Sequence, residues 1–379
     1  MTEALDLTGL PFVDAHMHPP YRRQPADLDA YRWPWYEGDR NDTALAAETA
    51  AYRWAIRELA RDLGCEPDEQ SVFAIVRQRE PAQWLAELAR RDGVVALVTD
   101  MGYPPPDETL SPVEIAAAGL EVAPLLRIEQ RAGVIAAECD RFGDFLDRFD
   151  AELAGARSAG YMGLKSVLAY RSGLGAEPTT AADAQAAYAR ARAGAPGAGE
   201  LFLTEKALLD FLFERALAVA RAEDMAVQLH TGYGDRDLDL PRSNPWLLRA
   251  LLERSETARA VPLVLLHGSF PYTGEAAVLA AIYPNIYFDV ATCVPPFTEA
   301  IQMQVWRTAL AMVPLSRIHA STDAAGLSEQ IGLGARQARR TLGIALAELV
   351  EIGSLTTGDA ERVAADVMAG TARRLYFGD

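Results

Sequence analysis

Four of the five histidines in this sequence, His16, His18, His230 and His267, stand at or just beyond the ends of short apolar runs. His16 and His18 form an HxH pair, and the period-two alternation of an extended strand turns both imidazoles to the same side. Two imidazoles on one side can share a metal ion. The pair by itself is a weak indication, because HxH also occurs on protein surfaces.

Asp323, in the run RIHASTD, adds a carboxylate at the end of a further apolar run. His16, His18, His230 and His267 offer nitrogens beside it, and three nitrogens with one carboxylate oxygen suit zinc, with manganese, iron or nickel as alternatives. Each residue alone also fits a simpler interpretation, such as a satisfied core histidine or a helix cap. The coincidence of all of them at predicted strand ends is what indicates a divalent metal site.

A metal held in this way favours hydrolysis. It lowers the pKa of its bound water to about 7 and polarises a substrate carbonyl, so that hydroxide attacks at neutral pH. We expect Asp323 to be ligand and base at once, accepting the proton of the water and passing it to the leaving group. His267, where it is not a ligand, would stabilise the oxyanion.

Lys165, in GLKSV, lies in the middle of a predicted strand, where burial of a lysine is costly unless it has a partner. One interpretation is a side chain that reaches solvent or pairs with a buried carboxylate. The other is a catalytic one, in which it bridges a second metal or places a cation at the reacting centre. His319 lies four residues before Asp323, too far toward the start of its strand, and we interpret it as structural.

These residues require a scaffold that gathers strand ends, and the rest of the sequence predicts one. Short apolar or β-branched runs alternate with longer alanine-rich amphipathic segments, the pattern of βα units. The predicted strands span residues 12–16, 94–100, 121–129, 161–170, 226–232, 261–269, 285–292 and 317–323, and credible helices include 111–119, 204–224 and 273–283. The pattern predicts an α/β fold, a (β/α)8 TIM barrel, whose catalytic face is built by the loops after the strands.

Three segments depart from this repeat. About 75 residues separate the first two strands, far more than a usual connection. We expect this insertion, residues 19–92 with at least two helices, to cap the barrel mouth; its Trp33 and Trp35 would form a lid or, as such pairs more often do, pack a core. Residues 173–200 predict an exposed helix between flexible joints, and 356–377 an extra helix packed outside the barrel. We find no second core and expect one domain, 1–379.

Composition limits the partners. The chain of 379 residues has 36 Lys and Arg against 53 Asp and Glu, a net charge of −17, and half of it is hydrophobic. Such an acidic balance argues against nucleic acid and anionic membranes as partners. The first residues lack the features of a signal peptide, and no apolar run has membrane-spanning length, so we expect a cytoplasmic protein. A homodimer is the expected assembly.

Cationic and aromatic residues after two predicted strands are candidates for substrate binding. Tyr170 and Arg171 follow the fourth strand, and Tyr233 and Arg236 follow the fifth. A guanidinium suits bidentate binding of a carboxylate. The competing interpretation, an arginine in an exposed loop, is stronger for Arg236 than for Arg171. Arg127, near the end of the third strand, is a weaker candidate by the same reasoning.

The order of these residues resembles a known family. HxH in the first strand, Lys165 in the fourth, His230 and His267 after the fifth and sixth, and Asp323 after the eighth are similar to the amidohydrolase superfamily of metal-dependent barrel enzymes. The stretches YMGLKSVLAYRSGL, LHTGYGD and VLLHGSFPYTGEAAVLAAIYPNIYFDV resemble more closely the amidohydrolase half of FluG-type proteins. The resemblance covers most of the chain from residue 12 and is densest from 161 to 323.

The resemblance implies one of two metal arrangements, and the sequence is compatible with both. In the mononuclear one, His16, His18, His230 and Asp323 hold one metal and His267 is free for catalysis. In the binuclear one, a carboxylated Lys165 bridges two ions, with His230 and His267 on the second.

Hydrolysis of a C–N amide bond in a small carboxylate-bearing molecule is therefore the expected activity. In FluG-type proteins the barrel precedes a glutamine-synthetase-like domain, and this association implies γ-glutamyl amides as a substrate class. A metal-dependent non-oxidative decarboxylase or related lyase of the same superfamily is the alternative, and a catalytically silent binding module is a third. The intact set of ligand-type residues argues against the third.

Overall fold

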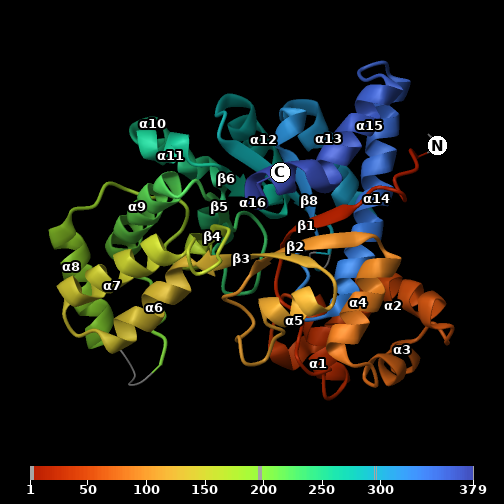
Figure 1. The fold of residues 1–379 in the computed structure, drawn as a ribbon, viewed down its shortest axis with the longest axis horizontal. Coiled ribbons are helices and arrows are strands. Elements are labelled where there is room, and N and C mark those ends of the chain that lie inside the picture. Colours follow the sequence, from red (N-terminus) through yellow and green to blue (C-terminus); the bar gives the residue numbers. More distant parts are fainter. Residues whose placement is uncertain (1–3, 195–198, 294, 296, 379) are drawn as a thin grey trace.

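The molecule is built around eight parallel strands that are paired in sequence order. The computed structural model describes residues 4–194, 199–293, 295 and 297–378. The strands are β1 (Phe12–Met17), β2 (Val94–Asp100), β3 (Glu121–Arg127), β4 (Gly163–Ser166), β5 (Ala226–Leu229), β6 (Leu263–Leu265), β7 (Ile286–Ala291) and β8 (Ile318–Ser321). Helices separate successive strands and surround the sheet (Figure 1). The predicted (β/α)8 barrel is confirmed.

The barrel is brought to closure just beyond the ends of β1 and β8. The amide of Asp323 donates to the carbonyl of His16 at 3.0 Å, and the amide of His18 donates to the carbonyl of Ala324 at 2.7 Å. His18 and Ala325 form an isolated parallel bridge. The first and last strands therefore meet at the level where candidate metal ligands stand on both.

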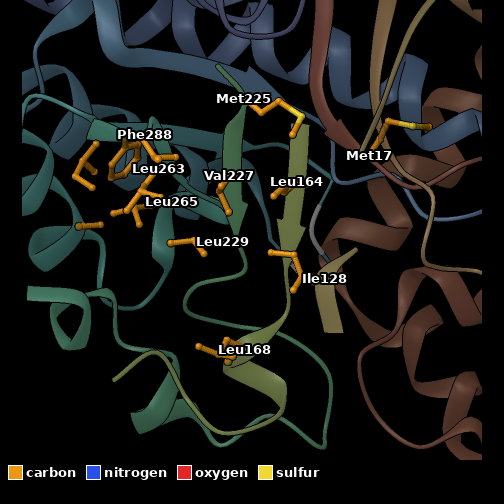
Figure 2. Close-up of a cluster of buried hydrophobic side chains, with 14 of the residues drawn as sticks. Met17, Ile128, Leu164, Leu168, Met225, Val227, Leu229, Leu263, Leu265 and Phe288 are labelled. Atoms are coloured by element: carbon orange, nitrogen blue, oxygen red, sulfur yellow. The ribbon is translucent and has the colours of Figure 1, made fainter. Parts of the chain in front are cut away.

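The strands alternate between two environments, as their sequences require. Leu164 of β4, Val227 and Leu229 of β5, Leu263 and Leu265 of β6 and Phe288 of β7 belong to one hydrophobic cluster between the sheet and the helices (Figure 2). The intervening residues Lys165 and Gln228 face the barrel interior, where Gln228 Nε2 donates to the carbonyl of Ala15 at 2.7 Å. This alternation places polar side chains inside the barrel while its outer face remains apolar.

The helices follow the expected segments closely. Those of the first half are α1 (Leu28–Arg32), α2 (Ala50–Leu63), α3 (Glu69–Val76), α4 (Pro81–Arg91), α5 (Pro112–Ala117), α6 (Ile128–Glu138), α7 (Phe142–Gly155) and α8 (Ala181–Ala193). Those of the second half are α9 (Lys206–Ala222), α10 (Arg249–Arg254), α11 (Glu256–Ala260), α12 (Thr273–Ile282), α13 (Glu299–Met312), α14 (Ser328–Glu351), α15 (Thr357–Ala365) and α16 (Thr371–Tyr376). In the described part of the chain, no helix combines the length and the apolar character needed to cross a membrane.

Local capping explains several helix boundaries. Ser111 and Glu114 form a reciprocal capping box at the start of α5, so the first backbone amides of that helix are satisfied. Thr49 caps α2, which ends at Gly64 in a left-handed conformation with φ of +66°. A residue without a Cβ adopts that conformation at little cost, which is why α2 stops there.

The insertion between β1 and β2 carries α1 to α4 and forms a second hydrophobic cluster with parts of the barrel, in which Trp35 packs as one of the two interpretations of the tryptophan pair predicted. Tyr31, Trp35, Tyr52 and Leu59 are buried in it, together with Leu333 of α14. Helix α14 runs past α2 and α4 (Figure 1). On this side Arg336 of α14 forms ion pairs with Asp62 and Asp92. The insertion is therefore fixed to the barrel wall by both apolar packing and ion pairs.

The segment after β4 forms the expected helix, which is exposed on one face and packed on the other. This helix is α8, and Tyr188 on it is buried, stacks on Phe145 of α7 with ring centroids 4.7 Å apart, and donates from its hydroxyl to the carbonyl of Cys139. The alanine-rich face of α8 is small enough to pack closely against α9. Residues 195–198 of the expected flexible joint lie outside the described residues.

The C-terminal segment differs from expectation. It is interrupted by a π-helical turn, Asp366–Gly370, and its last helix covers the start of the strands instead of packing only outside the barrel. Tyr376 is buried with Val13, Ala123 and Leu125, and its hydroxyl accepts a hydrogen bond from Gln228 Nε2 at 2.8 Å. This aromatic ring closes the end of the barrel opposite to the catalytic face.

Candidate metal centre

The candidate metal ligands converge at the mouth of the barrel although they are distant in sequence. His16 lies in β1 and His18 just after it, Lys165 lies in β4, and His230, His267 and Asp323 follow β5, β6 and β8. Parallel strands end at one edge of the sheet, so residues at these positions must meet.

The carboxylate of Asp323 is the hub of this group. Its Oδ1 lies 3.4 Å from His16 Nε2 and 3.8 Å from His18 Nε2, and its Oδ2 lies 3.2 Å from His267 Nδ1. Ligand atoms of His16, His267 and Asp323 all lie within 4.8 Å of one another. The two rings of the HxH pair thus reach the same carboxylate oxygen, as the alternation of the strand predicts.

Lys165 faces the same group. Its Nζ lies 3.1 Å from His16 Nε2, and its side chain is buried. Burial lowers the pKa of Lys165 to about 8. The lysine therefore does not reach out to solvent, and its ammonium group contacts an imidazole at the centre of the site.

The histidines have the properties of metal ligands. Burial lowers the pKa of each of His16, His18, His230 and His267, which favours the neutral imidazole that binds metals. His230 Nδ1 lies 3.0 Å from His267 Nε2, while His230 Nε2 has no hydrogen-bond partner although it is buried. An orphaned nitrogen beside nitrogen and oxygen donors fits a divalent cation, so the donor set suits the metal that the sequence predicts.

The backbone at two of these residues is in a sparsely populated conformation. His267 has φ of +62° and Asp323 has φ of +57°, both in the left-handed region that disfavours residues with a Cβ. The surrounding contacts hold them there: Asp289 of β7 accepts from the amide of His267 at 3.1 Å, and the amide of Asp323 bonds to His16. Strain of this kind concentrates at functional sites.

His319 lies at a different level. It is fully buried, and its Nδ1 lies 3.0 Å from the Oδ1 of Asp289, the residue that holds the backbone of His267. This contact agrees with a structural role: His319 supports the carboxylate that in turn supports the site.

A cavity of about 340 Å³ opens above the candidate metal centre. Its walls include His18, Lys165, His230, His267 and Asp323, and also Tyr170, Arg171, Tyr233 and Arg127. Four of the five residues considered for substrate binding are therefore brought beside the centre. Arg127, the weakest of them by sequence, is held by Asp100 of β2 through three hydrogen bonds of 2.6 to 3.2 Å.

Arg236 does not line this cavity. Its guanidinium pairs with Asp39 of the insertion and is 72% exposed, and its amide donates to the carbonyl of Glu37 at 3.0 Å. These contacts tie the loop after β5 to the insertion. The substrate-binding role expected for Arg236 therefore has no support in its position, because the side chain is occupied outside the cavity.

Arg171 has a different environment. Its guanidinium carbon lies 3.4 Å from the centroid of the Phe202 ring, and its nearest carboxylate oxygen, from Glu200, is 3.9 Å away. Most of the side chain is buried, and burial lowers the pKa of the guanidinium. Stacking on an aromatic face leaves the in-plane N–H donors available for a ligand.

Several cavity residues escaped the sequence analysis. Glu37 and Tyr103 lie in long connections after β1 and β2, Phe202 lies in the connection after β4, and Asp237 lies two residues beyond Asp235. Asp100 does not line the cavity but lies behind Arg127, and it had a sequence signal, since it ends the predicted strand VVALVTD as Asp323 ends another. Long loops carry no periodicity that would show which of their residues face the site.

A family model described as amidohydrolase matches residues 13–378. Protein fluG of Emericella nidulans is 35% identical to this chain over 223 residues, which make up 57% of this chain and 25% of that protein. The matched part thus spans a quarter of the length of this curated relative.

Solved structures share the fold. A crystal structure from Lactobacillus casei, assigned to the metal-dependent hydrolases, aligns with a TM-score of 0.88 at 27% identity, over 99% of this chain and 98% of that one. The uronate isomerase of Thermotoga maritima aligns with a TM-score of 0.69 at 16% identity, over 98% and 95% of the two chains. At that identity the similarity concerns the fold alone.

Proposed function

This chain belongs to the amidohydrolase family, and we propose that it is a metal-dependent hydrolase that cleaves the C–N amide bond of a small, carboxylate-bearing molecule. The observation that carries the proposal is the position of Asp323, which lies within 4 Å of three imidazoles on the wall of a cavity that also contains an arginine.

As the resemblance implies, His16, His18, His230 and Asp323 would hold one divalent metal, for which zinc is the first choice, and Lys165 with His267 would join them if a second ion binds. The ligand atoms that lie within 4.8 Å of one another are those of His16, His267 and Asp323. When bound, such a metal activates water and polarises the substrate carbonyl. The orphaned Nε2 of His230 and the neutral imidazoles support this assignment.

The reaction needs one proton acceptor and one donor, and Asp323 is placed to be both. Water adds to the amide carbon while the Asp323 carboxylate accepts its proton. The C–N bond then breaks, and the same proton passes to the departing nitrogen, which leaves as an amine beside the new carboxylic acid. His267 Nδ1, 3.2 Å from Asp323 Oδ2, orients this carboxylate, and a cationic Lys165 would stabilise negative charge on the carbonyl oxygen.

Arg171 and Tyr170 from the β4 side and Tyr233 from the β5 side would bind the rest of the substrate. We propose a γ-glutamyl amide as the substrate class, supported by the similarity to Protein fluG. That support is by association and concerns a relative of which only part is matched. The acidic net charge supports a small-molecule substrate in place of nucleic acid, and we retain the expectation of a cytoplasmic homodimer.

The test is a panel of γ-glutamyl amides assayed for released amine with protein that was purified without chelators. We expect turnover that disappears with a chelator and returns with zinc or manganese. Carbon dioxide release from aromatic or dienoic acids, without an amine product, would favour the decarboxylase alternative. Metal binding without turnover of either class would favour a binding module.

A further inference from the structure

Three carboxylates line the cavity beside the candidate metal centre without belonging to it. Glu37 comes from the insertion after β1, and Asp235 and Asp237 come from the loop after β5. Glu37 is half-buried, whereas Asp235 and Asp237 lie exposed at the rim. Segments about 200 residues apart in the chain therefore present like charges to the same space.

Specific contacts hold these segments together. The amide of Arg236 donates to the carbonyl of Glu37 at 3.0 Å, and its guanidinium pairs with Asp39, two residues farther along the insertion. The amide of Asp235 donates to the hydroxyl of Tyr170 at 3.1 Å. The guanidinium of Arg236 thus pairs outside the cavity, and the acids remain inside it or at its rim.

Among the described residues, no lysine or arginine forms an ion pair with Glu37, Asp235 or Asp237. Burial, and then the neighbouring carboxylate of Asp235, raises the pKa of Glu37 well above its usual range. In the described part of the chain, Glu37 and Asp235 have each other as neighbours and no basic partner, so a cation that enters the cavity stabilises their ionised forms.

The surroundings of these acids favour an organic ammonium group over a metal ion. Within the described chain, no group of three or more close-set ligand residues includes Glu37, Asp235 or Asp237, so nothing marks these acids as a metal site. The rings of Tyr36, Tyr103 and Tyr233 line the same cavity and offer faces to a desolvated ammonium.

The candidate metal centre borders this part of the cavity. His230 is 7% exposed and its Nε2 has no partner. A Cβ built on Gly234, next to Asp235, would lie 2.9 Å from that nitrogen, so the unsatisfied atom is directed at the loop that carries the acids. The glycine at 234 leaves space at the point where the metal centre and the acidic rim meet.

The same cavity contains the opposite charge. Arg171 has no side-chain hydrogen bond among the described residues, and its positive charge lies close enough to Asp237 to interact with it. A ligand with one carboxylate and one ammonium group can pair with Arg171 and with the acids at the same time. A dicarboxylate without an ammonium group is instead repelled by the acids.

We infer that the substrate is a zwitterion, an α-amino acid derivative whose carboxylate binds Arg171 and whose ammonium group binds Glu37 and Asp235 at the cavity mouth. This inference rests on the proposed function for the position of the reacting amide. It goes beyond it by assigning Glu37 and Asp235, from two loops, to the recognition of a positive charge that the hydrolytic chemistry does not require.

Binding of matched ligand pairs tests the inference without turnover. The probes are L-glutamate against glutarate and L-aspartate against succinate, which differ only by the α-ammonium group, titrated calorimetrically into zinc-loaded protein. We expect at least one amino acid to bind about tenfold more tightly than its partner, the factor that one charge-assisted hydrogen bond supplies. In Glu37→Gln and Asp235→Asn this preference should fall toward unity, with metal content unchanged.

Asp239→Asn is the matched control. Asp239 lies four residues from Asp235 in the same loop, pairs with Arg242 at 3.1 Å and does not line the cavity, so the preference should persist. Equal binding within each pair, preference for the diacids, or no binding of any probe would overturn the inference. Amide turnover without a preference for the amino acids would contradict this inference and leave the hydrolase proposal intact. A preference for the amino acids without amide turnover would support this inference and contradict the hydrolase proposal.

Discussion

The Oδ2 atom of Asp323 lies 3.2 Å from Nδ1 of His267, and both residues have a positive φ. The two residues follow different strands, β8 and β6, and 56 positions separate them in the chain (323 − 267). Their side chains meet because their strained backbones are held by hydrogen bonds to His16 and to Asp289. The strain is therefore tied to the position of the carboxylate that the proposed reaction uses as base.

Asp323→Asn tests the metal assignment directly. We expect the wild type to contain at least one equivalent of divalent metal per chain by elemental analysis, and the variant to lose it together with all amide turnover. The amide keeps the shape of the carboxylate but removes the negative charge that neighbours three neutral imidazoles. Two equivalents in the wild type would implicate a carboxylated Lys165, and one would leave His267 free for catalysis.

The control for this variant is Asp239→Asn, which removes an exposed carboxylate that does not line the cavity and should leave metal content unchanged. Metal retained in Asp323→Asn at the wild-type level, or absent from the wild type after reconstitution, would contradict the assignment.

Lys165→Gln should lower kcat by about a hundredfold or more, the usual effect of removing a group that stabilises transition-state charge. The reason is the position of Nζ, 3.1 Å from His16 Nε2 in a buried site. Steady-state kinetics and elemental analysis on the same sample separate the two roles of the lysine. Loss of one of two metal equivalents indicates a bridging ligand, and unchanged metal with lost activity indicates an electrostatic role. Activity within threefold of the wild type would exclude both.

Arg171 and Arg236 form a matched pair of variants. Arg171→Gln should reduce kcat/KM for a carboxylate-bearing substrate by about 10- to 100-fold, since a hydrogen bond to a charged group contributes roughly 1.5–3 kcal/mol. Arg236→Gln should change it by less than about threefold, because that guanidinium pairs with Asp39 outside the cavity. Equal effects of the two substitutions would show that the arginines do not differ in the way their positions indicate.

The burial of Glu329 leads us to expect that the stability of the folded protein depends on pH, independently of the metal centre. This glutamate lies in the first turn of α14 and is buried, and burial raises its pKa from 4.5 to about 7. Below pH 4.5 both the folded and unfolded chains hold the proton. Between pH 4.5 and 7 the unfolded chain releases it first, so the folded state loses stability as pH rises, up to roughly 3 kcal/mol above pH 7.

Glu329→Gln removes this loss, because glutamine does not ionise. We expect the variant to melt at a higher temperature than the wild type at pH 8, with the difference shrinking toward pH 5, as measured by calorimetric melts in chelator-free buffer. Glu361→Gln, at an exposed position on α15, is the control and should show no such trend. A difference that does not vary with pH would assign the effect to packing instead of ionisation.

The sequence predicted the strands well where their residues alternate and less well where apolar runs continue past the sheet. The fourth predicted strand, 161–170, contains β4, Gly163–Ser166, followed by a 3-10 turn, Leu168–Tyr170. Tyr170 and Arg171 therefore project from a turn at the cavity wall. An apolar run indicates that a segment is buried, but the hydrogen bonds to a neighbouring strand determine where the strand ends.

The sequence by itself determined the barrel and the residues at its mouth, because βα alternation and strand-end positions are local patterns with one simple topological solution. It did not determine the partners of those residues. Arg236 pairs with Asp39 of the insertion instead of lining the cavity. Tyr376 closes the end of the barrel opposite to the site. Glu37 lines the cavity although it lies in a loop without periodicity. Only the tertiary structure decided these, since a loop side chain acquires its neighbours from the packing of segments that are distant in the chain.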